Sequence, residues 1–388
     1  MKLKASYGVT GNAAINWGDA VPIYNFGFTG AGNNYNGQPI RYLSSLGNPD
    51  LIWERNYTLD AGVEFGLLND RITTDLTYFR RITKGAVINT ALQASSGIDN
   101  LVYIQNIGEI LNKGVEFGLV TRNTVGAIKW TTRLNLTHIK NRVLEVGTAT
   151  PDALAGGFGD TRAIPGEPVN TNYIVRFSHV DPATGAPVYL TGTGEETFTY
   201  SVANNRFAAG NGMPDLTGGI TNEFAWKNFD LNFLVYFSLG GKIYDDAAKR
   251  HMGVVTDDWN MRRDYLDRWT QPGDNARYPR ATMTMLNWGG NANFWQNNHT
   301  LWLEDASFAR LRTVNIGYNI KPAQGQIRNI RLSLQGTNLL TFTNYTGVDP
   351  EVARERGNSQ ERNIGGTNIT FLTPPNERTV TFGVNVDF

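Results

Sequence analysis

The chain has 388 residues, of which 42 are glycine, 11% are aromatic and only 18% are charged, and its formal net charge is zero. With no excess of basic residues, there is no stripe that could neutralise phosphates, so no nucleic-acid partner is expected. The absence of cysteine excludes disulfides, thiolate metal sites and cysteine nucleophiles. The longest apolar runs are as short as residues 233–237, so no helix of about 20 apolar residues is expected to cross a bilayer.

The N-terminal residues alternate between apolar and polar side chains, and a long predicted loop follows them. Alternating apolar residues predict a strand over residues 2–9. A stretch rich in Gly and Asn follows, and we expect a connection over residues 10–56. Residues 57–65 and 72–78 alternate on either side of residues 68–70, which predicts a hairpin with a short turn.

A second hairpin follows the same pattern. Strands are predicted over residues 115–119 and 129–142, with a turn near residues 123–126. The hexapeptide Gly-Val-Glu-Phe-Gly-Leu occurs at residues 62–67 and again at residues 114–119. Its glutamate falls on the polar parity each time, so both copies are predicted to present one polar and one apolar face.

Two more hairpins lie in the second half of the chain. The third joins residues 218–226 to residues 229–239 through Lys227-Asn228, and its return strand has the clearest apolar parity in the chain. The fourth joins residues 308–320 to residues 330–338. Both hairpins have the period of two that is typical of strands with one apolar face.

The last strand is predicted over residues 378–388. Eleven residues at about 3.3 Å each, tilted by about 45°, rise roughly 25 Å, the height of the apolar band of a transmembrane barrel. A strand of a soluble sandwich would alternate in the same way, so repetition along the chain decides in favour of the membrane. The terminal aromatic residue, Phe388, is interpreted as the assembly signal read by the barrel-assembly machinery.

Short turns alternate with long polar connections, which is typical of an outer-membrane β-barrel. A soluble domain should not need so many long loops. Residues 173–179 and 188–189 form a predicted hairpin that is too short to span, so ten barrel strands are expected. Residues 143–215 and 241–300 are expected to be extracellular loop insertions. The long connections are residues 10–56, 80–113, 143–215, 241–300 and 339–377.

The positions of two tryptophans agree with a barrel whose short turns lie at one membrane interface and whose long loops lie at the other. Trp130 and Trp226 lie beside short turns on the apolar parity, where a membrane girdle is expected. One predicted strand conflicts with a purely apolar face, because Arg310 and Arg312 share the parity of Val314. Either a β-bulge resets the register or the two arginines reach to the extracellular rim.

No catalytic constellation is found. The four histidines are scattered and are expected at solvated positions, without a metal site. The acid pairs Asp245-Asp246 and Asp257-Asp258 are likewise expected to be solvated. No cofactor and no enzymatic activity are therefore predicted. Charges on the polar parity are better explained by a wet or plug-facing interior: Asp60, Glu64, Asp75, Glu116, Arg133, Glu223, Asp230 and Arg331.

Several stretches, in a constant order over nearly the whole chain, resemble the C-terminal half of the SusC/RagA-type TonB-linked (TonB-dependent) outer-membrane transporters. They are residues 4–12, 48–54, 106–116, 307–318 and 338–351. The resemblance implies an all-β fold in which residues 1–388 form an antiparallel fragment, about ten strands of a 22-stranded plugged barrel. The family's plug, TonB-contacting box and export signal have no counterpart here. Its acidic calcium loop is replaced at residues 191–196, so no metal is expected.

The resemblance also implies the function and the partners. Family members import glycans or peptides in the outer membrane of Gram-negative bacteria similar to the Bacteroidetes. The implied partners are outer-membrane lipid, a SusD-type surface lipoprotein, the TonB complex acting through the plug, and a glycan or peptide ligand. The leading hypothesis is import of a bulky nutrient, chiefly an oligosaccharide. The alternatives are a small non-transporting outer-membrane barrel, porin or adhesin, and a secreted β-rich carbohydrate-binding protein.

Two further hypotheses concern ligand contact and closure. Trp259, Trp269, Trp288 and Trp295 lie among polar residues in one loop and could stack on sugar rings, although packing within the loop's own small core or against the lipoprotein is the preferred explanation. If the chain is part of a larger barrel, residues 2–9 and 380–388 should not pair, and an open curved sheet is expected. A continuous ladder between them would favour the small-barrel alternative.

Overall fold

The computed structural model describes residues 1–388 apart from 14, 17, 27–33, 36–37, 40, 92–101, 148, 150, 157–160, 249–251, 253–259, 282–296, 323–325, 353–368 and 372. The described residues form β-strands joined by turns and by the short 3-10 helices η2 (Pro151–Leu154), η3 (Arg263–Asp267) and η5 (Thr300–Trp302). Within this part of the chain, no helix has the length and apolar character needed to cross a membrane.

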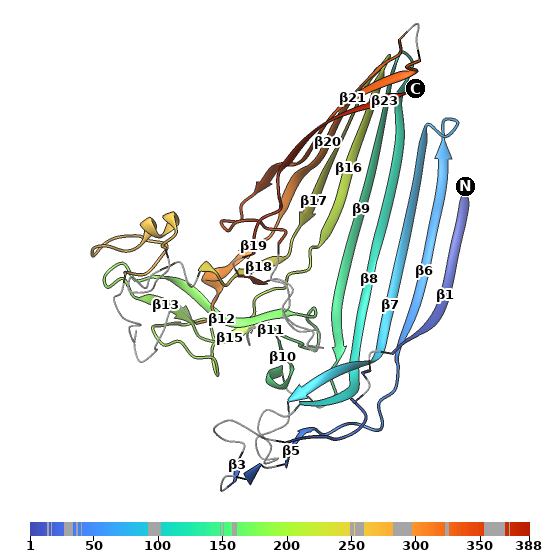
Figure 1. The fold of residues 1–388 in the computed structure, drawn as a ribbon. Coiled ribbons are helices and arrows are strands. Elements are labelled where there is room, and N and C mark those ends of the chain that lie inside the picture. Colours follow the sequence, from blue (N-terminus) through green and yellow to red (C-terminus); the bar gives the residue numbers. More distant parts are fainter. Residues whose placement is uncertain are drawn as a thin grey trace.

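Ten strands form one antiparallel sheet, which Figure 1 shows as a curved wall. Its strands, in spatial order, are β1 (Lys2–Asn12), β6 (Glu54–Leu67), β7 (Ile72–Ala91), β8 (Val102–Val125), β9 (Ile128–Glu145), β16 (Leu216–Trp226), β17 (Phe229–Leu239), β20 (Phe308–Ile320), β21 (Asn329–Thr343) and β23 (Thr379–Asp387). All ten predicted strands are confirmed. Those of β17 and β20 have the predicted bounds.

The tight turns between these strands use left-handed backbone. Leu68, Asn69 and Asp70 have φ of 54°, 54° and 60°, and Lys227 has φ of 53°. Positive φ in a short connection matches the right-handed twist of the two strands that it joins. The predicted turns at residues 68–70 and 227–228 are therefore confirmed.

The predicted loop over residues 80–113 is wrong. Residues 80–91 belong to β7 and residues 102–113 to β8. Simple alternation fails here because the left-handed Gly85 (φ 63°) lies where the β7–β8 register shifts. Beyond that shift, Ile88 is buried in a small core that loop residues complete, so its surroundings no longer follow the period of two.

The two faces of the sheet differ in chemistry. Large apolar side chains remain exposed from β1 to β23 on the apolar face. The register places all eight charges of the predicted interior set on the opposite, polar face. Four of them pair with one another across strands: Arg331 donates to both oxygens of Asp230 at 2.7 and 2.8 Å, and Arg133 lies 3.1 Å from Glu223.

A β-bulge resolves the parity conflict in β20. The pairing of β20 with both neighbours skips Arg312, so Leu311 and Thr313 follow one another in the ladders. The extra residue moves Arg310 to the polar face while Val314 stays on the apolar face. The bulge alternative is therefore confirmed, and Arg310 is buried.

The sheet has two edges, β1 and β23. Among the described residues, no ladder joins these two strands, and each pairs with one neighbour only, β6 or β21. The open sheet agrees with the expectation for part of a larger barrel. Ten strands closed into a small barrel, the alternative arrangement, are not observed.

The connections build smaller sheets, which Figure 1 shows together on one side of the ten-stranded sheet. The predicted short hairpin is confirmed as β12–β13, outside the ten-stranded sheet. These smaller strands are β2 (Ile23–Phe26), β3 (Asn34–Tyr35), β4 (Gln38–Pro39), β5 (Arg41–Ser45), β10 (Ala155–Gly156), β11 (Thr161–Arg162), β12 (Thr171–Val180), β13 (Pro187–Leu190), β14 (Glu196–Thr197), β15 (Arg206–Ala208), β18 (Lys242–Asp245), β19 (Leu303–Asp305) and β22 (Ile369–Thr370).

Candidate functional site

Three connections of the sheet share one aromatic core beside its end. This loop core consists of Ile174, Val175, Ala186, Tyr189, Tyr244, Ala248, Met252, Tyr265, Tyr278, Trp302 and Ile369. Its members follow β9, β17 and β21, which are far apart in the sequence. The loops are therefore one packed unit, held by burial of apolar surface. Sequence periodicity could not predict it, because its contacts join separate loops.

His299 lies at the centre of this unit. Its ring is fully buried, 6.0 Å from the ring of Tyr189 and 5.5 Å from that of Trp302. Next to it, the Thr300 hydroxyl accepts a hydrogen bond from the backbone N–H of Phe177 at 3.0 Å. The prediction of a solvated histidine is wrong here, because the imidazole lies against aromatic rings of another connection, Phe177 and Tyr189, and of its own, Trp302.

Trp269 is the one predicted ligand-contacting tryptophan within the described residues. Its indole N–H donates to the carbonyl of Pro182 at 2.9 Å, and its ring lies against Gly185. Both partners belong to the turn between β12 and β13, so Trp269 fixes that turn while its ring stays partly accessible. Trp259, Trp288 and Trp295 lie outside the described residues. A role of these four residues in ligand binding stays a prediction.

An ion cluster lies beside the loop core. Arg262 contacts Asp245 at 2.7 Å and Asp264 at 2.9 Å and donates to the carbonyl of Thr346 at 3.0 Å. Burial lowers the pKa of Arg262, but the two carboxylates together raise it above its ordinary value. Asp245 and Asp246 are buried, so the prediction that this acid pair is solvated is wrong. Asp257-Asp258 lies outside the described residues.

A cavity of about 290 Å³ opens beside this cluster. Its lining includes Asp245, Arg262, Tyr345 and Thr370. Burial is the main reason that the pKa of Tyr345 is raised, so the phenol stays neutral, and its hydroxyl lies 3.1 Å from that of Thr370. Hydroxyls, a guanidinium and a carboxylate on one wall suit a polar ligand that forms hydrogen bonds.

A second ion network attaches the connection after β21 to the sheet. Arg310 and Asp349, both buried, contact each other at 2.5 Å, and Glu351 lies 2.9 Å from Arg310 and also contacts Arg312. Burial raises the pKa of Asp349, but hydrogen bonds from Glu351 N–H, Arg310 and Asn376 N–H outweigh it, so the net pKa is lowered. The connection is thereby fixed to the polar face.

The predicted girdle residues lie near the short turns. Trp130 stacks on Phe224 at 5.4 Å between ring centroids, and its indole N–H donates to Asn222 at 2.9 Å. Trp226 is 50% exposed, with the amine of Lys227 5.1 Å from its ring. An exposed aromatic ring with a bonded polar atom suits a membrane interface, and the girdle role stays a prediction.

In the described part of the chain, no three His, Asp or Glu side chains lie close enough together to form a metal-ligand set. The strong polar groups are instead used in ion pairs that hold loops, as at Arg262 and Arg310. The polar face of the sheet and the cavity beside Arg262 therefore present hydrogen-bonding groups, and they are best suited to the binding of a polar ligand.

Among curated proteins, the chain is 29% identical to TonB-dependent receptor P26 of Formosa agariphila, in an alignment that covers all of this chain and 40% of that protein. It is 23% identical to TonB-dependent receptor SusC of Bacteroides thetaiotaomicron, over 91% of this chain and 35% of the relative. The chain thus spans about 40% of the length of the first of these relatives.

Among solved structures, a chain of the RagAB peptide importer matches with a TM-score of 0.79 and 23% identity, covering all of this chain and 40% of the other. At this identity, the likeness shows the fold. A family model described as TonB dependent receptor-like, beta-barrel matches residues 2–339. The chain therefore belongs to the TonB-dependent receptor-like β-barrel family.

Proposed function

We propose that this chain forms part of the wall of a TonB-dependent outer-membrane transporter that imports a bulky nutrient, chiefly an oligosaccharide. The observation that carries the proposal is a sheet with an exposed apolar face and, opposite it, a polar face that holds charged residues, with ion pairs across strands at Arg133 and Arg331. Such a wall separates lipid from a wet interior. Loops packed as one unit beside its end are placed to meet a ligand before it enters.

The substrate class follows from the surfaces available. Trp269 is partly accessible, and the cavity beside Arg262 offers hydroxyl, guanidinium and carboxylate groups. Aromatic rings stack on the apolar faces of sugars, while polar groups bond to their hydroxyls. Peptide import is the second candidate, favoured by the fold shared with the RagAB peptide importer.

The proposed partners act at different surfaces. Outer-membrane lipid contacts the apolar face, and a SusD-type surface lipoprotein covers the loops over the loop core. The TonB complex acts through a plug that other parts of the protein supply, and the barrel-assembly machinery reads the last strand with Phe388. SusC and RagAB, which the chain resembles, support the lipoprotein proposal.

The test uses the full-length protein that contains this chain. Uptake of fluorescent oligosaccharides and of fluorescent peptides is measured in producing cells, in cells with the gene disrupted, and in cells without TonB. We expect oligosaccharide uptake that requires both genes. Oligosaccharide uptake that is unchanged by gene disruption would contradict the proposal, and loss of peptide uptake alone would establish the second candidate.

A further inference from the structure

Three neighbouring strands place a row of positive charges on the apolar face. Arg80 in β7 lies directly opposite Lys113 in β8, and Lys113 lies directly opposite Lys140 in β9. Their parity is that of Tyr78 and Val115, which are exposed on the apolar face. Because side chains alternate between faces, all three cations share the side of the sheet that would contact lipid.

The row lies at one border of the apolar face. Lys140 follows Trp130, beside the short turn, by ten residues along β9. At about 3.3 Å per residue and a tilt of about 40°, that distance corresponds to a rise of roughly 25 Å, the height of a barrel's apolar band. The row therefore lies at the opposite interface from the short turns, on the side of the long loops.

These charges are not neutralised within the described part of the chain. Like charges directly opposite each other on neighbouring strands destabilise a sheet. Arg80, Lys113 and Lys140 are exposed and form no ion pair there, whereas Lys84, four residues beyond Arg80 on the same strand, pairs with Glu109 at 3.6 Å. On the polar face, Arg133 and Arg331 each pair with an acid of another strand, whereas the row presents three cations without such a partner, which an anion from outside the sheet would neutralise.

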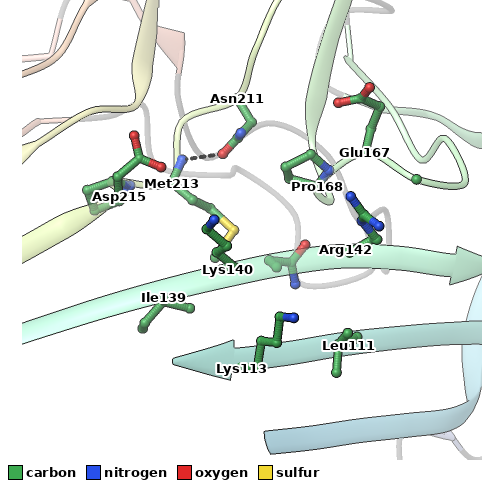
Figure 2. Close-up of a pocket in the computed structure, with 13 residues that line it drawn as sticks. Leu111, Lys113, Ile139, Lys140, Arg142, Glu167, Pro168, Asn211, Met213 and Asp215 are labelled. Atoms are coloured by element: carbon green, nitrogen blue, oxygen red, sulfur yellow. Dashed lines mark hydrogen bonds between the residues drawn. The ribbon is translucent and has the colours of Figure 1, made fainter. Parts of the chain in front are cut away.

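A cavity adjoins the row, as Figure 2 shows. Its volume is about 490 Å³, and Lys113, Lys140 and Arg142 line it together with the segments 166–168 and 211–215. Its two acids, Glu167 and Asp215, form no ion pair within the described residues, and Figure 2 shows the carboxylate of Glu167 directed away from Arg142. The volume lies within the usual range for small-ligand pockets, about 300–1,000 Å³.

We propose that Arg80, Lys113, Lys140 and Arg142 bind the phosphate groups of an anionic lipid of the outer leaflet. The apolar face below the row contacts the acyl chains, and the cavity holds the phosphorylated head group. Clusters of Lys and Arg at a membrane border recognise anionic head groups in this way, and guanidinium binds phosphate with two parallel hydrogen bonds. The proposal rests on the proposed function only for its placement in the outer membrane.

The experiment compares two matched double variants of the full-length protein, purified in detergent. K113Q/K140Q removes two charges of the row, one from β8 and one from β9. R122Q/K129Q removes two charges from the same strands on the polar face near the short turns. Binding of diphosphorylated lipid A and of its dephosphorylated form is measured by native mass spectrometry. Migration of unheated samples on gels confirms that each variant is folded.

We expect K113Q/K140Q to bind diphosphorylated lipid A about thirtyfold more weakly, while R122Q/K129Q and the charge-preserving K113R/K140R bind as the parent does. Equal binding by K113Q/K140Q and the parent would overturn the proposal, as would equal binding of the dephosphorylated lipid. Displacement of the lipid by millimolar inorganic phosphate would assign the row to free anions instead.

Substrate binding is measured on the same samples. The row faces lipid, so we expect K113Q/K140Q to retain the parent's affinity for oligosaccharide. Loss of lipid with substrate binding intact supports the lipid site. If the parent binds lipid A through the row but imports no oligosaccharide, the proposed function fails while the lipid site stands.

Discussion

The ten-stranded sheet and the loop core are stabilised in different ways. In the sheet, long ladders of backbone hydrogen bonds hold side chains that remain largely exposed, as along all of β1. In the loop core, strands are as short as two residues and form few backbone hydrogen bonds. The loops are held instead by buried aromatic side chains and by ion pairs. A membrane completes the solvation of the sheet, whereas the loop core must bury its own apolar groups. Point substitutions should therefore be costly in the loops and mild on the sheet.

Trp302 gives the largest expected effect. Its side chain is 2% exposed and stacks on Tyr278 at 6.4 Å. Trp302→Ala leaves a cavity and should cost about 3–5 kcal/mol of loop-core stability. Hydrogen exchange at the amides of β18 measures the loss, and Phe198→Ala, at a residue 49% exposed in the same loops, is the control. Equal exchange in the two variants would show that the loop core is not a cooperative unit.

The second prediction compares the loss of stability when a buried ion network and an exposed ion pair are broken. Arg310→Met leaves Asp349 buried without its cation and should cost about 3–5 kcal/mol. Arg133→Met breaks the exposed pair with Glu223 and should cost at most about 1 kcal/mol. Thermal unfolding of the two variants measures both losses of stability. A smaller loss for Arg310→Met than for Arg133→Met would contradict the assignment of loop anchoring to this network.

Acid should release the same connection. The folded pKa of Asp349 is below its ordinary 3.8, so the ionised carboxylate contributes stability in full above about pH 4, and this is lost as pH falls through the folded pKa. Protection of the Glu351 and Asn376 amides, which donate to Asp349, should fall over that window. Asp349→Asn should remove this pH dependence. A pH dependence that persists in the variant would assign it to another group.

Trp269 gives the smallest expected effect. Trp269→Ala should weaken oligosaccharide binding by about 1 kcal/mol, or about fivefold, with surface expression unchanged. Calorimetry on the full-length protein measures it, with Trp53→Ala, an exposed tryptophan in another connection, as the control. Unchanged affinity would restrict Trp269 to its contact with Pro182 and leave ligand binding to other residues.

The sheet could be predicted from the sequence because each strand carries its own pattern. The strand Phe229–Leu239 alternates between two environments, so its bounds, direction and face follow from local residues. Even the bulge at Arg312 left a signal, a change in parity within one strand. Prediction failed where Gly85 shifts the register and where side chains leave the two-faced environment, as at Ile88.

The loop core could not be predicted because its contacts depend on which loops meet. His299 lies in a segment without a periodic pattern, and its ring partners Phe177 and Tyr189 are more than 100 residues away in β12 and β13. Asp245 gave no sign of burial, since its partner Arg262 lies in an irregular segment. The tryptophans of residues 241–300 indicated a loop with dense side-chain contacts. The contact of Trp269 with the turn at Pro182 could not be predicted from the sequence.

The central claim is that alternate residues of the sheet face lipid and water. This chain has no cysteine, so single cysteines can be placed at successive positions of β9 from Thr131 to His138, in a full-length protein without other cysteines. Each is spin-labelled in a reconstituted bilayer, and its collisions with oxygen and with a water-soluble nickel complex are compared. We predict oxygen access at even positions and nickel access at odd positions. The same access at neighbouring positions would contradict a sheet with one lipid face and one wet face.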